Sequence, residues 1–219
     1  FNVAREYGQH LFLSSFYRKK GTEKILFKGG TALRFVYKSP RFSEDLDFSA
    51  TEVNNQGIEI MLEEVLVDLE NQNQECEIEE AKPTSGGYLA NLATRIHGER
   101  IRIAIQISLR KKLKIDRQTL PLVIEYVPSY VANILPLEEM AGEKVQAALT
   151  RAKPRDFFDI YFLLREGLFP RGDMENLPKI KEILKRGKVS FGKELALFLP
   201  LSMKPFVKDF PGPLLAEIE

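Results

Sequence analysis

The sequence predicts an α+β protein in which a mixed β-sheet flanked by helices is followed by an all-helical C-terminal part. Apolar and polar residues alternate over 100–109, which is typical of a strand with one buried face. A short apolar strand at 25–27 runs into a glycine pair that opens a helix. From residue 137 onward the pattern is helical, with prolines as punctuation. We therefore expect an α/β core domain over 1–130 and a helical region over 131–219.

The first elements are short and closely spaced. Residues 2–20 are predicted to form a helix that Gly21 stops. The strand at 25–27 leads through the glycine pair into a helix over 31–36, which ends before a Ser-Pro pair. Residues 45–50 alternate between polar and apolar side chains, so they are predicted to form a second strand. The expected order is strand, glycine turn, helix, strand.

The later elements complete the predicted sheet. A helix is expected over 56–72, because its apolar residues recur at helical spacing. Strands are expected at 76–82, 89–97 and 122–126, in addition to the one at 100–109. In that last strand the isoleucines form one face, which we expect in the core. The opposite face is free for chemistry and carries Arg102, Ala104, Gln106, Ser108 and Arg110.

Composition indicates a folded protein of the cytoplasm. Hydrophobic residues make up 44% and charged residues 29%, which is ordinary for a globular chain. The single cysteine, Cys76, excludes a disulfide framework and a multi-cysteine zinc site, and it suits a reducing compartment. No run approaches the ~20 apolar residues that span a bilayer, and the first residues do not resemble a signal peptide. We therefore expect no membrane partner.

The net charge and the two histidines exclude few classes of function. The net charge of +1 gives no argument from composition for a nucleic-acid partner. Basic clusters at 110–117 and 179–193 are either ordinary solvated faces or contacts to an RNA backbone. The two histidines have no partner at metal-ligand spacing, so we expect His10 on a helix surface and His97 at a strand end.

The glycine pair provides a candidate anion site. A strand that ends in Gly29-Gly30-Thr31 and opens a helix presents free backbone N–H groups and the positive end of a helix dipole. Thr31 adds a hydroxyl, and Lys28 and Arg34 place cations nearby. The alternative is a turn that uses glycine for packing alone.

Two aspartates provide a candidate metal site. Asp45 and Asp47 are spaced i, i+2 on a strand, so their carboxylates project from one face about 7 Å apart at the backbone. Hard divalent cations bind such pairs. The alternative is a solvated strand face, or ion pairs with Arg41. A phosphate cradle beside a two-carboxylate metal site is the apparatus of phosphoryl or nucleotidyl transfer.

These motifs, with a second signature downstream, resemble a known family. The first signature is KGGTAL at 28–33 followed by RFSEDLDF at 41–48. The second is LEEMAGEKVQAAL at 137–149 followed by RDFFDIY at 155–161. Together they are similar to the signatures of the AbiEii/AbiGii-type toxins, within the DNA polymerase β-like nucleotidyltransferase superfamily. The resemblance implies a nucleotidyltransferase core.

The resemblance also implies a function and a set of site residues. It implies the toxin of a toxin–antitoxin or abortive-infection system, which transfers a nucleoside monophosphate from an NTP to a hydroxyl of an RNA such as tRNA. A cognate antitoxin would be the protein partner, and Mg²⁺ or Mn²⁺ the cofactor. The implied catalytic residues are Asp45, Asp47 and Lys144, with both aspartates on the metal. The implied nucleotide-binding residues are Lys28, Gly29, Gly30, Thr31, Arg41, Arg155 and Asp156.

The downstream residues also admit structural interpretations. Lys144 lies seven residues after Leu137 on a helix, so its stem falls on the inward stripe and its ammonium favours an anion. The alternative is a lysine that snorkels at the edge of the core. Asp156 suits a helix N-terminus, and Arg155 with Asp159 forms an i, i+4 pair. These residues either support the helix or contact substrate.

One position departs from the superfamily pattern. Many members carry a third acidic residue on a later strand, where this chain has Gln106. A glutamine oxygen can bind a cation but cannot take a proton from the nucleophile. Three options follow: a weakened general base, another residue in that role, or nucleotide binding without turnover. A nucleotide-binding or partner-binding module with lapsed catalysis is therefore one rival function, and an enzyme that nucleotidylates protein is another.

Overall fold

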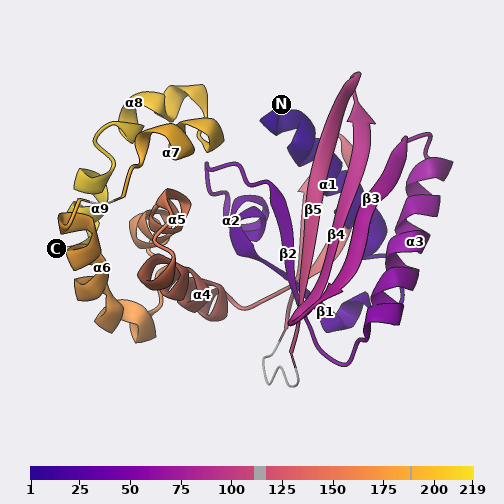
Figure 1. Cartoon of the computed structure of the whole chain (residues 1–219), viewed down its shortest axis with the longest axis horizontal. Coiled ribbons are helices and arrows are strands. Elements are labelled where there is room, and N and C mark those ends of the chain that lie inside the picture. The colour runs from indigo at the N-terminus through magenta and orange to yellow at the C-terminus, as the bar shows by residue number, and fades with distance from the viewer. Residues whose placement is uncertain (111–116, 188) are drawn as a thin grey trace. The chain divides into compact units, whose positions relative to one another are not determined.

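The protein divides into two compact units in a computed structural model that describes residues 1–110, 117–187 and 189–219 (Figure 1). Unit 1 comprises Phe1–Tyr37 and Ser43–Leu135. Unit 2 comprises Lys38–Phe42 and Pro136–Glu219. Of the two predicted basic clusters, residues 111–116 and 188 lie outside the described residues.

Unit 1 is built on a mixed seven-stranded sheet with the order β3-β4-β5-β2-β1-β7-β6. β2 is antiparallel to β1 and parallel to β5, and β1 is parallel to β7. The mixed sheet that the sequence predicts is therefore confirmed. The strands are β1 (Ile25–Lys28), β2 (Asp45–Ala50), β3 (Cys76–Thr84), β4 (Gly87–Ile96), β5 (Glu99–Leu109), β6 (Gln118–Ile124) and β7 (Val127–Ile134).

Three helices pack against the sheet, and a 3-10 turn, Thr22–Lys24, precedes β1. α1 (Asn2–Phe16) contacts β5 and β7, α2 (Gly29–Tyr37) contacts β1 and β2, and α3 (Asn55–Asn71) contacts β3 and β4. Aromatic rings fill the interface between these helices and the central strands. This cluster consists of Phe16, Phe27, Phe35 and Phe48, with neighbouring ring centroids 5.3 to 6.3 Å apart. The core of unit 1 therefore lies on one side of the sheet.

The two faces of β5 differ as its alternation predicts. The side chains of Ile101, Ile103 and Ile105 are buried. Arg100, Arg102 and Gln106 are exposed on the opposite face. The face without isoleucines is therefore accessible to a ligand.

The structure corrects two sequence-based predictions in unit 1. Residues 122–126 were expected as one strand, but Glu125 and Tyr126 form the turn between β6 and β7. This turn has no glycine, and Pro121 interrupts the alternation on β6, a strand at the edge of the sheet. His10 was expected at the surface, yet it is buried: its Nδ1 lies 2.9 Å from the Tyr130 hydroxyl, and its ring stacks on Phe35.

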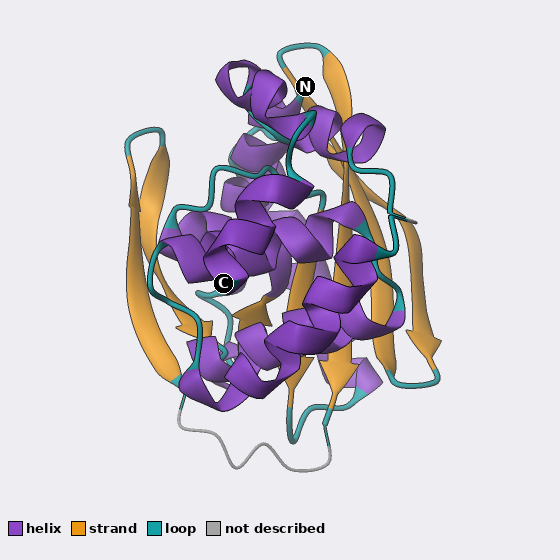
Figure 2. Ribbon diagram, turned by 90° about the vertical axis from the view of Figure 1, so that its left-hand side faces the viewer, coloured by secondary structure: helices purple, strands orange, loops and turns teal. Residues whose placement is uncertain are grey.

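Unit 2 consists of helices, with no strand among its described residues; helices are purple in Figure 2. Its core is rich in phenylalanine, including Phe157, Phe158, Phe191 and Phe210. The linker segment Lys38–Phe42 belongs to this unit, because the Phe42 backbone N–H donates to the Phe198 carbonyl at 2.7 Å. The elements are α4 (Leu137–Thr150), α5 (Pro154–Arg165), α6 (Leu177–Lys185), α7 (Gly192–Phe198), α8 (Lys204–Val207) and α9 (Pro211–Ile218), with 3-10 turns at Arg171–Asn176 and Leu201–Met203.

The predicted all-helical C-terminal part is present. Among the residues that the structure describes, none of the helices is long and apolar enough to cross a membrane.

Candidate active site

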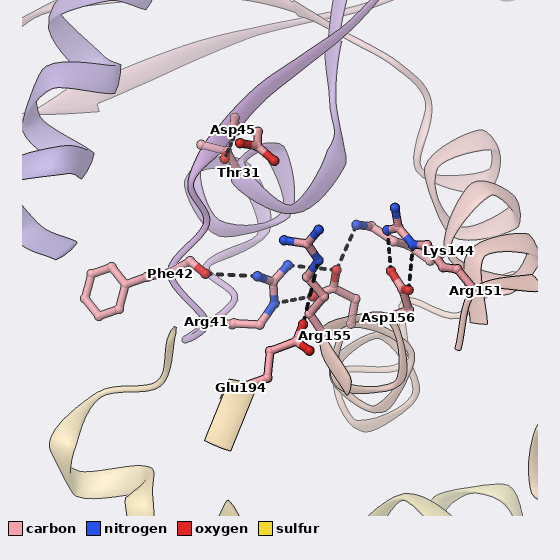
Figure 3. A network of polar contacts seen from close by, with 10 residues as sticks. Thr31, Arg41, Phe42, Asp45, Lys144, Arg151, Arg155, Asp156 and Glu194 are labelled. Atoms are coloured by element: carbon pink, nitrogen blue, oxygen red, sulfur yellow. Dashed lines mark hydrogen bonds and ion pairs between the residues drawn. The ribbon is translucent and has the colours of Figure 1, made fainter. Parts of the chain in front are cut away.

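The glycine turn joins β1 directly to α2. β1 ends at Lys28, which is only 7% exposed, and α2 begins at Gly29. Gly29 has a φ of +81°, in the left-handed region that favours glycine. The Thr31 hydroxyl donates to the Asp45 carbonyl at 2.5 Å, which ties the first turn of α2 to the start of β2 (Figure 3). Thr31 therefore fixes the turn against the aspartate strand.

Gly29 also allows a close approach by Asp47. A Cβ atom added at Gly29 would lie within 3.0 Å of three atoms of the Asp47 side chain, including one carboxylate oxygen. In the β1–β2 register, Lys28 is the partner of Asp47. The structure thus brings the carboxylate of Asp47 against the glycine turn, and a side chain at position 29 would occupy the same space.

The alternation of β2 presents both aspartates on one face. Leu46 and Phe48 are fully buried on the helix-covered face, while Asp45 and Asp47 are partly exposed on the other. Because β2 pairs in parallel with β5, Asp45 lies beside Ala104 and Asp47 beside Gln106. Gln106 occupies the position where the sequence comparison expects a third acidic residue.

The donor atoms on this face fit a hard divalent cation. Two carboxylates spaced i, i+2 and a neighbouring amide oxygen are all oxygen donors, which Mg²⁺ prefers. Within residues 1–110, 117–187 and 189–219, no group of three or more His, Cys, Asp or Glu side chains is arranged to hold a metal. A metal on this face would therefore take two carboxylates from the protein and complete its shell with other oxygens.

Helix α1 holds the segment that enters β2. The side-chain amide of Gln9, which is 1% exposed, donates to the carbonyls of Ser43 and Glu44 at 3.1 and 3.0 Å. Arg5 forms an ion pair with Glu44 at 3.0 Å. These contacts fix the backbone that immediately precedes Asp45, so the position of this carboxylate depends on α1 as well as on the sheet.

In unit 2, three charged residues form a buried network. The Arg41 guanidinium donates from Nε and Nη2 to both Asp159 oxygens, at 2.8 and 2.9 Å. The Lys144 ammonium lies 2.8 Å from Oδ2 of the same carboxylate. The side chains of Arg41, Lys144 and Asp159 are 3%, 12% and 1% exposed. We call these three residues the buried trio; it carries a net charge of +1.

The buried trio keeps Asp159 ionised. Burial alone would raise the pKa of this carboxyl, but the charges of Arg41 and Lys144 and their hydrogen bonds lower the pKa to about 2. The third nitrogen of Arg41, Nη1, donates to the Phe42 carbonyl at 2.9 Å. Arg41 thus links the segment Lys38–Phe42 to α5, and Lys144 links α4 to α5.

The remaining predicted residues lie at the start of α5. Asp156 is fully buried and accepts two hydrogen bonds from Arg151, at 2.7 and 2.9 Å (Figure 3). Arg155 lies 4.0 Å from Glu194, not in the expected pair with Asp159. Asp159 instead binds Arg41, 118 residues away in sequence. Asp159 was not among the predicted site residues, although an acidic residue within an otherwise apolar helix is itself a signal of a buried partner.

The fold of the chain matches two solved structures from Helicobacter pylori. The solved structure of JHP933 from Helicobacter pylori matches with a TM-score of 0.65 and 22% identity, covering 99% of this chain and 90% of the other. A candidate nucleotidyltransferase from H. pylori matches with a TM-score of 0.62 and 22% identity, covering 97% of this chain and 95% of the other. At this identity the two structures establish the fold.

The family follows from the sequence match. The model of the nucleotidyl transferase AbiEii toxin family, a type IV toxin–antitoxin system, matches residues 11–191. The chain belongs to this family, as its two signatures predicted. A search of curated proteins gives no match. Membership of a toxin–antitoxin family implies a cognate antitoxin as partner.

Proposed function

We propose that the protein is a Mg²⁺-dependent enzyme that transfers a nucleoside monophosphate from an NTP to a hydroxyl of an RNA acceptor such as tRNA. The observation that carries this proposal is the contact between the glycine turn and the aspartate strand. Gly29 leaves space for the Asp47 carboxylate, and Asp45 projects from the same strand face. The proposed anion site and the two carboxylates thus lie within one unit.

Each residue of this turn has a proposed task. The backbone N–H groups of Gly29, Gly30 and Thr31, at the N-terminus of α2, bind phosphate oxygens of the triphosphate. Lys28, whose side chain is buried at the end of β1, adds positive charge. Because these groups are fixed by the sheet before substrate arrives, they position the triphosphate without rearrangement.

Asp45 and Asp47 would hold Mg²⁺, or Mn²⁺, through their carboxylate oxygens. When bound, the ion supplies charge neutralisation to the triphosphate and to the leaving pyrophosphate. In the reaction, the acceptor oxygen forms a bond to the α-phosphorus and the bond from that phosphorus to the pyrophosphate breaks. Gln106 cannot take the proton of the acceptor hydroxyl, so that proton leaves to water or to another residue.

In unit 2, the family resemblance implies nucleotide contacts for Lys144, Arg41 and Arg155. Lys144 binds Asp159 within unit 2, and its contact with the nucleotide stays a prediction of the family resemblance. All three guanidinium nitrogens of Arg41 already donate hydrogen bonds, which favours a role in positioning Asp159 and Lys144. Asp156 and Arg151 stabilise the start of α5, and Arg155 stays a predicted phosphate contact.

Transfer of label from an NTP tests this function. The protein is incubated with each α-³²P-labelled NTP, Mg²⁺ and total RNA, and the products are separated on a denaturing gel. We expect labelled RNA with wild-type protein and at least a hundredfold less with Asp45→Ala or Asp47→Ala, because each variant removes a proposed metal ligand. Asp68→Ala, at a carboxylate bound by Lys19 in unit 1, is the matched control and should keep its activity.

Gln106 supports one alternative, a nucleotide-binding module without turnover. In that case the wild-type protein would bind Mg²⁺–NTP, measured by calorimetry, but would label no acceptor. Addition of cell protein to the same reaction separates the third option, since a labelled protein band without labelled RNA identifies a protein acceptor. Absence of both binding and transfer would contradict the proposed use of the glycine turn.

A further inference from the structure

The strand order places the aspartates between two different surfaces of unit 1. β2 lies between β1, whose end carries the glycine turn, and β5. β4 and β3 continue the sheet beyond β5 (Figure 1). A phosphate held at the glycine turn is therefore on the β1 side of Asp45 and Asp47, and the polar face of β5 and β4 is on the opposite side.

In nucleotidyl transfer, the acceptor must approach the phosphorus from the side opposite the leaving pyrophosphate. The attacking and leaving oxygens lie roughly in line at the phosphorus atom. A triphosphate at the glycine turn directs its pyrophosphate toward β1, so the acceptor hydroxyl approaches from the side of β5. This step rests on the proposed function, whereas the pocket on the β5 side and its contacts do not depend on it.

A pocket of about 530 Å³ opens on that side. Asp45 forms part of its wall, so the pocket reaches the proposed catalytic face directly. The other polar side chains in its wall are Arg5, Glu44, Asn91, Arg100 and Arg102. All of these residues belong to unit 1.

The two arginines of β5 are spaced to contact a phosphodiester chain. Arg100 and Arg102 alternate on the strand, so both project from the open face about 7 Å apart at the backbone. This separation is close to that of successive phosphates along a single strand. The planar guanidinium also matches the geometry of phosphate oxygens better than an ammonium does.

The present partners of these arginines are easily exchanged. Glu79 accepts from Arg100 at 2.7 Å and from Arg102 at 2.5 Å, and Glu77 also accepts from Arg100. The arginine side chains are 49% and 73% exposed, and ion pairs at such positions contribute little to stability. A polyanion can therefore displace Glu79 from both arginines, and Glu77 from Arg100, without disturbing the fold.

Arg5 provides an independent indication of a ligand. Its side chain is 10% exposed, and its pairing with Glu44 uses Nη1. Its Nε is buried without a hydrogen-bond partner among the residues that the structure describes. Buried donors are almost always satisfied, so an unmet one in the wall of a pocket is typical of a group that completes its bonding with a ligand or a bound water.

We propose that this pocket is the acceptor subsite and that it binds the phosphodiester backbone of a single-stranded RNA segment next to the acceptor hydroxyl. Arg100 and Arg102 contact successive phosphates. Arg5 and Asn91 contact the nucleotide that lies nearest Asp45. Glu79 holds the two arginines in place while the subsite is empty.

RNA binding in the absence of NTP tests the subsite separately from catalysis. A short labelled single-stranded RNA of mixed sequence, and total tRNA, are titrated with the full chain at several salt concentrations. Each phosphate contact to single-stranded RNA changes the slope of log K against log salt by about 0.7, so each lost contact weakens binding about fivefold near 0.1 M salt. We expect Arg100→Gln and Arg102→Gln each to show this loss, and the double variant to bind about 25-fold more weakly.

A variant that should bind RNA more tightly gives a sharper test. Glu79→Gln removes the carboxylate that both arginines share, while Glu77 still binds Arg100, so we expect RNA binding to tighten by about threefold to fivefold near 0.1 M salt. The exposed ion pair Arg165–Glu217 in unit 2, at 3.0 Å, lies outside the pocket. Arg165→Gln and Glu217→Gln are therefore the matched controls, with no expected effect on binding.

The outcomes separate this inference from the proposed function. Unchanged RNA affinity and salt slope in the double variant, or changes no larger than in the controls, would overturn the acceptor subsite even if the wild-type protein labels RNA. Loss of RNA binding in the double variant supports the subsite even if no transfer is found. Labelling of protein, with RNA binding unaffected by Arg100 and Arg102, would also overturn it. The affinity for Mg²⁺–NTP should stay unchanged in all of these variants.

Discussion

Aspartates occupy opposite environments in the two units. On β2 of unit 1, Asp45 and Asp47 are partly exposed on an open strand face beside the glycine turn. In unit 2, Asp159 is 1% exposed and both of its oxygens are bound by Arg41 and Lys144. An accessible carboxylate can bind a cation or a substrate, whereas an enclosed carboxylate holds other groups in position. Substitutions of Asp45 or Asp47 should therefore affect activity more than stability, and those at the buried trio the reverse.

The buried trio affects the stability of unit 2 mainly because removal of one partner leaves the other charges unpaired. Taking three charges out of water costs free energy that their mutual attraction only partly repays, so such a network need not stabilise the fold relative to apolar residues. Removing one partner is different, because the others stay buried without a counter-charge. The trio joins Lys38–Phe42, α4 and α5, so the cost is expected to appear as loosening of unit 2.

The largest expected effect is that of Asp159→Ala. This change leaves the Arg41 and Lys144 cations buried without their carboxylate, which should lower the free energy of unfolding by about 3–5 kcal/mol. Urea denaturation followed by circular dichroism measures the loss, and hydrogen exchange of the α4 and α5 amides assigns it to unit 2.

Two other aspartates serve as comparisons. Asp68→Ala removes a 32% exposed carboxylate that also binds cations, Lys19 and Arg18, and should cost only about 1 kcal/mol. Asp45→Ala should abolish transfer while changing stability by less than about 1 kcal/mol. Similar losses of stability in all three variants would remove the distinction between the two units.

The next effect is the pH dependence of unit 2. The pKa of Asp159 is about 2 in the folded protein, below the ordinary value near 4 of the unfolded chain. Its contribution is therefore present above about pH 4 and is lost as the pH falls through 4 toward 2, to an extent of about 2–3 kcal/mol. Urea midpoints measured across this range should fall with decreasing pH, and Asp159→Asn should show a flatter profile over the same interval.

Asp68 also contributes to the acid dependence of stability. Hydrogen bonds from Lys19 lower the pKa of Asp68 as well, so part of the acid dependence belongs to unit 1. The difference between wild-type protein and Asp159→Asn isolates the contribution of Asp159. If the two profiles are parallel between pH 4 and 2, the carboxyl of Asp159 is not held ionised by Arg41 and Lys144.

The sequence predicted unit 1 well where its signals are local. The order of β1, α2 and β2 follows from an apolar run, two glycines and a period of two, which depend only on neighbouring residues. The same period placed Asp45 and Asp47 on the face opposite Leu46 and Phe48. The period of two did not predict where β6 ends and β7 begins, because the turn formed by Glu125 and Tyr126 carries none of the usual turn residues.

The sequence predicted less of the candidate site where distant segments meet. Arg155 was expected to pair with Asp159 because of helical spacing, yet Arg41 and Lys144 bind that carboxylate. Nothing in the local pattern around residue 41 indicates a partner on α5. Arg5 was not recognised at all, because its contact with Glu44 depends on how α1 packs against the sheet. Tertiary contacts of this kind override helical pairings that each contribute only a few tenths of a kcal/mol.

A smaller effect is expected from Gly29→Ala, which tests the close approach in unit 1. The φ of +81° costs a non-glycine residue about 1–2 kcal/mol, and the added Cβ would displace the Asp47 side chain. We therefore expect a loss of about 2 kcal/mol together with a large loss of transfer activity. Chemical denaturation and the labelling reaction measure the two quantities on the same preparation.

Gly98 is a matched control for this change. It has the same φ of +81°, but a Cβ at Gly98 would meet no atom within 4 Å. Gly98→Ala should therefore cost only the backbone strain, about 1 kcal/mol, and should keep full activity. Full activity in Gly29→Ala would show that Asp47 does not need its position against the glycine turn.

The smallest effect is expected at Ser49, on the same strand face as the two aspartates. Its hydroxyl is buried and has no hydrogen-bond partner among the described residues. Ser49→Ala removes an unsatisfied polar group, so the free energy of unfolding should change by less than about 0.5 kcal/mol or increase. Ser15, which is equally buried, donates to Asp68 at 2.9 Å, so Ser15→Ala should cost about 1 kcal/mol.

Ser49 and Ser15 provide the same comparison of environments for uncharged side chains. If both variants lose the same free energy by urea denaturation, then the Ser49 hydroxyl has a partner, and a water bound on the aspartate face is the simplest one. Such a water would lie two residues along β2 from Asp47, on the face proposed to hold the metal. A loss at Ser49 that disappears when Mg²⁺ and NTP are added would identify that water as one the substrate displaces.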